Sequence, residues 1–132
     1  MILAGAPSVT WALSLGCASA YTLVAAPLWR DRPQRLRASI GLAWALHAMA
    51  IAWGLWGAEP RFGFAPALSV TAWLVGLVYM VETWIYPQVK TPSFVHGASV
   101  LVVMLALAFP GALVHPSMSP WMPLHWALGI AS

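Results

Sequence analysis

Charged residues are scarce in this sequence. Only 7% of its 132 residues are Asp, Glu, Lys or Arg, whereas 61% are hydrophobic. A soluble globular chain carries charge at about a quarter of its positions, because its surface must stay in water. The composition therefore excludes a soluble protein and predicts an integral membrane protein whose main partner is the lipid bilayer.

Cysteine and the usual catalytic motifs are also missing or nearly so. The single cysteine, Cys17, can form no intrachain disulfide and no cysteine metal site, and we expect it to pack in the core. The sequence has no nucleotide-binding glycine motif, no metalloprotease helix, no paired catalytic carboxylates and no nucleophile elbow. These absences leave an ordinary hydrolase without catalytic residues, so we do not expect an enzyme.

What the sequence does have is a series of long apolar runs. A helix rises about 1.5 Å per residue, so about 20 residues cross a hydrocarbon core of roughly 30 Å. We predict an all-α fold, a polytopic transmembrane helix bundle with four full spans and an incomplete fifth. The predicted spans are 8–29, 39–57, 65–86, 94–109 and, in part, 120–132. Because the last run is too short to cross, we expect residues 1–132 to be a single membrane domain from the N-terminal part of a longer protein.

The basic residues predict how this bundle is oriented. Four arginines fall between the first two spans, in the segment 30–38, which reads RDRPQRLRA. Short loops rich in Lys and Arg stay in the cytoplasm, and Lys90 falls in the second loop on the same side. Only Arg61 lies on the other side, so the N-terminus is expected outside. The cluster serves topology in this interpretation, and we predict no nucleic-acid partner.

One ionisable residue, His47, falls in the middle of the second predicted span. Ala43, Ala50 and Gly54 share its helix face at spacings of four, three and four residues, so it faces a groove lined by small side chains. Burying such a group in a membrane is costly, which makes it a functional candidate by default. Two interpretations stay open: a neutral histidine hydrogen-bonded to a neighbouring helix, and a ligand to a cofactor.

The second and third spans should form an antiparallel hairpin. Residues 58–64 are too few for anything but a tight turn, so the two spans are neighbours. Small residues on both would let the backbones approach closely, namely Ala43, Ala50 and Gly54 on one side and Ser69, Ala72 and Gly76 on the other. Glu82 is expected to reach the lipid headgroups from the end of the third span, with a proton or cation contact as the alternative. His96 is expected at the membrane interface.

The order of several short motifs resembles the cytochrome c assembly family, most closely its CcsA/HemX-like inner-membrane branch. The motifs are LHA at 46–48, FGF at 62–64, ALS at 67–69, WL at 73–74 and PLHW at 123–126. The resemblance covers nearly the whole chain and the first half of such proteins, which usually have about eight spans. It implies a multi-pass protein of the inner (plasma) membrane that handles haem during cytochrome c biogenesis, with other maturation proteins as partners.

The histidines are the candidate haem ligands, because histidine is the usual axial ligand of haem on membrane helices. By position in the motifs, the resemblance implies His47 and His125. Because His115 is closer in depth to His125 than His47 is, all three are kept as candidates for the cofactor site. The alternatives are half of a proton- or ion-coupled transporter, with His47 and Glu82 on the path, and a structural membrane scaffold.

Overall fold

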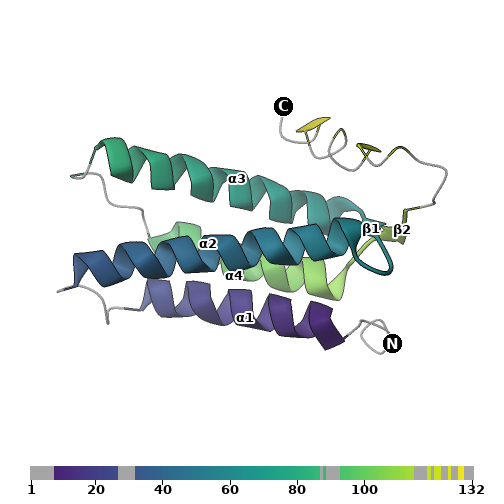
Figure 1. Ribbon diagram of the computed structural model, residues 1–132, viewed down its shortest axis with the longest axis horizontal. Coiled ribbons are helices and arrows are strands. Elements are labelled where there is room, and N and C mark those ends of the chain that lie inside the picture. The colour runs from purple at the N-terminus through teal and green to yellow at the C-terminus, as the bar shows by residue number, and fades with distance from the viewer. Residues whose placement is uncertain are drawn as a thin grey trace.

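The part of the chain that the structure describes forms four helices and one short strand pair. The computed structural model describes residues 8–26, 32–86, 88, 93–114, 119, 121–122, 125 and 128–129. Within them the helices are α1 (Ser8–Ala25), α2 (Pro33–Trp56), α3 (Phe64–Ile85) and α4 (Ser93–Ala108), and the strands are β1 (Arg61–Phe62) and β2 (Ala112–Leu113). Consecutive helices run in opposite directions along one axis (Figure 1). The predicted helical bundle is confirmed.

Three of the helices, α1, α2 and α3, are long and apolar enough to cross a membrane. The fourth, α4, has 16 residues and rises only about 24 Å, less than a hydrocarbon core of roughly 30 Å. The prediction of four full spans is therefore not confirmed, because three helices reach the length and the fourth is shorter. The predicted partial fifth span, 120–132, falls largely outside the described residues.

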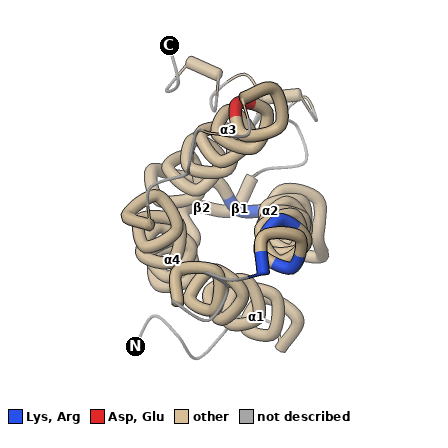
Figure 2. Tube along the Cα trace, turned by 90° about the vertical axis from the view of Figure 1, so that its left-hand side faces the viewer, with Lys and Arg blue, Asp and Glu red and all other residues tan. Residues whose placement is uncertain are grey.

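The boundaries of the first two helices differ from those predicted. α1 ends at Ala25 instead of at 29, because the next residue precedes a proline and helical backbone is disfavoured there. α2 begins at Pro33 instead of at 39, since a proline suits the first turn of a helix and has no N–H to leave unpaired. Part of the segment predicted as a basic loop is thus helical. Figure 2 shows the basic residues around the beginning of α2, which we call the basic end of the bundle.

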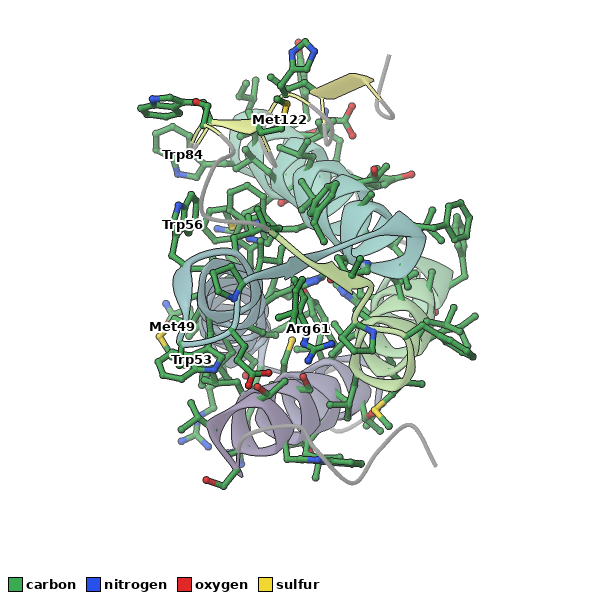
Figure 3. The ribbon with its side chains drawn as sticks, turned by 90° about the vertical axis from the view of Figure 1, so that its right-hand side faces the viewer. Met49, Trp53, Trp56, Arg61, Trp84 and Met122 are labelled. Carbon is green, nitrogen blue, oxygen red and sulfur yellow. The ribbon has the colours of Figure 1, made fainter. Side chains whose placement is uncertain are left out.

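A strand pair closes the opposite end, which we call the β end. The turn after α2 contains β1, and β1 pairs antiparallel with β2, with Arg61 opposite Leu113. Gly111 lies beside this pair with a φ of +82°, and a Cβ there would collide with the Phe62 carbonyl, so only glycine fits. Figure 3, which looks onto this end, shows Arg61 between the helices. The predicted tight turn is confirmed, but the strand pair was not predicted.

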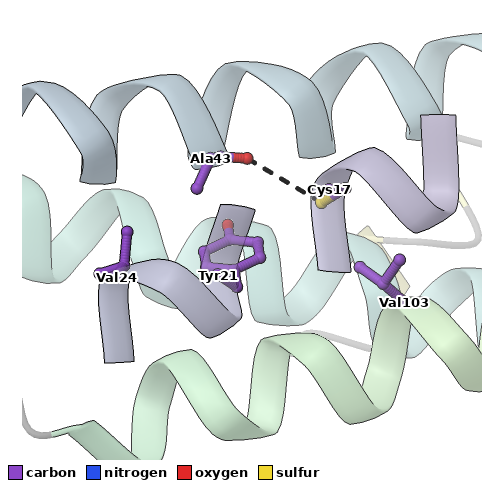
Figure 4. Close-up of a cluster of buried hydrophobic side chains, with 5 residues drawn as sticks. All are labelled: Cys17, Tyr21, Val24, Ala43 and Val103. Atoms are coloured by element: carbon purple, nitrogen blue, oxygen red, sulfur yellow. Dashed lines mark hydrogen bonds between the residues drawn. The ribbon is translucent and has the colours of Figure 1, made fainter. Parts of the chain in front are cut away.

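The four helices form a ring in which each one packs against two others. α1 packs against α2 and α4, and α3 packs against the same two helices. Tyr21, Val24 and Val103 form a core cluster with Cys17 and Ala43, and the Cys17 thiol points to the Ala43 carbonyl at 3.9 Å (Figure 4). Cys17 is therefore a packing residue, as predicted.

The predicted small-residue contact between α2 and α3 is only partly present. A Cβ placed on Gly76 would lie 3.5 Å from Cδ1 of Trp44, so this glycine does lie at the helix contact. A Cβ placed on Gly54 would meet nothing within 4 Å. Gly54 instead lines a cavity at the β end, and the prediction that it packs tightly against α3 is wrong.

Candidate functional site

The candidate site is centred on His47, whose side chain is fully buried with 0% exposure. Its Nδ1 lies 3.2 Å from the hydroxyl oxygen of Tyr21 on α1, and its Nε2 lies 2.8 Å from the hydroxyl oxygen of Ser69 on α3. A neutral imidazole has one N–H donor and one acceptor nitrogen, and the two hydroxyls can serve either. Both ring nitrogens are therefore satisfied, and the imidazole links three helices.

Local sequence positions explain why these three side chains meet. His47 follows Ala43 by one helical turn, so the face that packs against α1 also carries the imidazole. Tyr21 follows Cys17 by one turn on α1, and both are buried toward α2. Ser69 falls in the second turn of α3, on the side that faces α2. The structure thus agrees with the interpretation of His47 as a neutral histidine that is hydrogen-bonded to neighbouring helices.

A second buried histidine, His96 on α4, belongs to the same cluster. Its ring stacks on Tyr21 with centroids 6.1 Å apart and an interplanar angle of 24°, while His47 meets Tyr21 edge-on at 5.6 Å. The sequence predicted only a position at the interface for His96. The structure adds that the first turn of α4 directs this side chain into the core, where it is 7% exposed. One signal was available in the sequence, the helical spacing of His96, Ser99 and Val103. The structure shows that all three are buried.

Two cavities flank this cluster along the bundle axis. The larger, about 80 Å³, lies toward the β end and has Ser69 in its wall. The smaller, about 10 Å³, lies toward the basic end and has Tyr21 and His96 in its wall. Because Ser69 and Tyr21 are the two hydrogen-bond partners of His47, the imidazole lies between the two cavities.

Arg61 is the charged residue of the larger cavity. It comes from β1, lines the cavity, and pairs with Glu59 at 3.0 Å. Both side chains of the pair are partly exposed, so solvent screens the ion pair and it adds little to stability. Its position places a guanidinium at the β end, beside a cavity that is otherwise mainly apolar.

The other two predicted haem ligands are not at this site. His125 is exposed, and its backbone N–H donates to the Trp121 carbonyl at 2.9 Å. No hydrogen bond or ring contact joins His125 to His47. His115 lies outside the described residues. Glu82 is exposed on α3, as expected of a carboxylate that reaches the headgroups, and it does not join the cluster.

A pair of tryptophans that the sequence did not single out holds α2 against α3. Trp44 donates its indole N–H to the Trp73 carbonyl at 3.1 Å, and Trp73 donates to the Trp44 carbonyl at 3.2 Å. The two rings stack with centroids 4.5 Å apart at 16°. This reciprocal contact fixes the rotation of α2 relative to α3, and therefore helps to place Ser69 against His47.

Fold and site together define a helical membrane bundle with a hydrogen-bonded histidine at its centre. No family model matches the chain, and neither a curated protein nor a solved structure matches it. Membership of the cytochrome c assembly family therefore stays a prediction from the sequence motifs.

Proposed function

We propose that this chain is a haem-handling membrane protein related to the cytochrome c assembly proteins. The order of the motifs supports the relationship, and one structural observation supports a ligand position. His125 is exposed one helical turn after Trp121, which is itself 71% exposed. An accessible imidazole next to a flat aromatic surface is a suitable arrangement for an axial ligand and a porphyrin plane. In this proposal His125 binds haem iron.

The role proposed for His47 is more demanding. Iron binds histidine through the lone pair of a ring nitrogen, and on His47 both nitrogens already take part in hydrogen bonds. Iron at Nε2 would have to displace the Ser69 hydroxyl. If His47 is an axial ligand, Ser69→Ala should therefore strengthen haem binding, because it removes the competing partner.

Titration of the purified chain with haem in detergent tests the proposal. Loss or shift of the Soret band in His125→Ala would support it, because a change of axial ligand alters this band. His47→Ala and His115→Ala report on the other two candidates, and His96→Ala is the matched control, a buried histidine that is not proposed as a ligand. If the three candidate variants and the wild type give the same spectrum and affinity, the haem proposal fails.

Partner proteins from cytochrome c maturation follow from the same resemblance. Affinity purification of the tagged chain from membranes, followed by mass spectrometry, tests this part. Recovery of haem-handling or cytochrome c proteins would support it, and their absence from repeated purifications would contradict it. Fractionation of the cell membranes, with detection of the tagged chain in each fraction, checks the proposed inner-membrane location.

A further inference from the structure

Three buried polar side chains form a continuous row across the middle of the bundle. Ser69, His47 and Tyr21 come from three different helices and are joined by contacts of 2.8 Å and 3.2 Å. Many buried polar side chains have only one hydrogen-bond partner. Here each nitrogen has a hydroxyl partner, and a hydroxyl can both accept and donate a proton.

Each end of this row faces a different cavity. Ser69 lines the larger cavity, in which Thr10 and Ser14 supply two further hydroxyls. Tyr21 lines the smaller cavity with Ser99. A cavity holds a water when it offers about 10 to 15 Å³ and polar partners, so the larger one accommodates several waters and the smaller one about one. Hydrogen-bonding groups thus extend from both cavities to the two ring nitrogens of His47.

We propose that Ser69, His47 and Tyr21 form a proton path between the two cavities. This inference does not depend on haem binding. Metal ions and larger solutes cannot pass along this path, because side chains close the row and His47 is fully buried. The exposed Glu82, which the sequence suggested as a second group on such a path, has no part in it.

The transfer is balanced at each atom. With the imidazole proton on Nδ1, Ser69 gives its proton to Nε2 and regains one from water in the larger cavity. The Nδ1 proton passes to the Tyr21 oxygen, while Tyr21 releases its own proton to water in the smaller cavity. One proton enters, one leaves and no electron is transferred, so the imidazole ends with its proton on Nε2. The ring then turns so that Nε2–H faces Tyr21 and Nδ1 faces Ser69, and the next transfer of the same kind returns the ring proton to Nδ1.

Proton flux into liposomes tests the path. The full chain is reconstituted in phosphatidylcholine and phosphatidylglycerol vesicles that contain potassium and a pH-sensitive dye, and valinomycin then sets an inside-negative potential. We expect the wild type to acidify the interior faster than empty vesicles. Tyr21→Phe and Ser69→Ala each remove one hydroxyl of the row, and both should lower the rate to that of empty vesicles.

The matched control is Thr71→Val, which removes a hydroxyl two positions after Ser69 on the same helix. The Thr71 hydroxyl donates to the Ala67 carbonyl of its own helix at 3.1 Å, so this variant should conduct like the wild type. Circular dichroism of each variant checks the fold, and the two row variants give independent readings if one of them does not fold. The proposal is overturned if the wild type is no faster than empty vesicles. It is also overturned if folded Tyr21→Phe or Ser69→Ala conducts at the wild-type rate, since the row is then only structural.

Discussion

Replacing His47 with leucine removes the group that links α1, α2 and α3 while keeping a side chain of similar size. Two hydrogen bonds are lost, and each is worth about 0.6 to 1.7 kcal/mol between membrane helices. The hydroxyls of Tyr21 and Ser69 also lose the imidazole as a partner, and water cannot easily replace it because the two residues are only 3% and 5% exposed. We therefore expect His47→Leu to lower the free energy of unfolding by about 1 to 3 kcal/mol.

A double-mutant cycle with Tyr21→Phe separates this linkage from general packing. Removing both partners of the Tyr21–His47 bond leaves neither of its two groups unsatisfied, and the Ser69 hydroxyl is in the same state in His47→Leu and in the double variant. The double variant should therefore lose less than the sum of the two single variants by about 1 kcal/mol. Reversible unfolding is followed by circular dichroism in mixed micelles as the fraction of dodecyl sulfate rises. Thr22→Val is the control, because its hydroxyl donates to the Ala18 carbonyl of its own helix at 2.8 Å, and it should not couple to His47.

Additive losses would refute this reasoning. If the coupling between His47→Leu and Tyr21→Phe stays below about 0.3 kcal/mol, the 3.2 Å contact does not link α1 to α2 energetically. The same result would remove one link of the proposed proton path. Strong coupling with the Thr22 control would instead show that any change in this part of α1 is felt at His47, and that the cycle measures packing.

Three further predictions concern the rest of the bundle. Trp44→Leu and Trp73→Leu should each destabilise the protein, and the cycle should show coupling of about 0.5 to 1.5 kcal/mol from the stacked rings in the same unfolding assay. Additive effects would mean that the indoles do not interact. Gly111→Ala should cost about 1 to 3 kcal/mol, because alanine is strained at a φ of +82° and would strike a carbonyl; an unchanged unfolding midpoint would contradict this. Cysteines at Gln34 and Arg61 should react with a membrane-impermeant maleimide from opposite sides, with Arg61→Cys labelled from outside. Labelling of that cysteine only from the cytoplasm would reverse the predicted orientation.

Local sequence was sufficient for the helices and their order. An apolar run of spanning length has few options in lipid other than a helix, because every backbone N–H and C=O must be satisfied within the segment. The short connection between α2 and α3 in turn forces an antiparallel hairpin. The errors in the boundaries of α1 and α2 came from the prolines, whose effect on a helix depends on whether they fall in its first turn or after its end.

The sequence by itself determined that this protein is a membrane helical bundle with a histidine in its second helix, because length, hydropathy and spacing are properties of a single segment. Only the tertiary structure decided what each helix faces. A helix that is apolar all round carries no clear amphipathic signal, so the helical spacing of His96, Ser99 and Val103 was only a weak indication, and the packing of α4 against α1 decided that His96 turns inward. The strand pair at Arg61 and the partners of His47 join residues that are far apart in the chain, and such contacts are set by how the helices rotate and pack together.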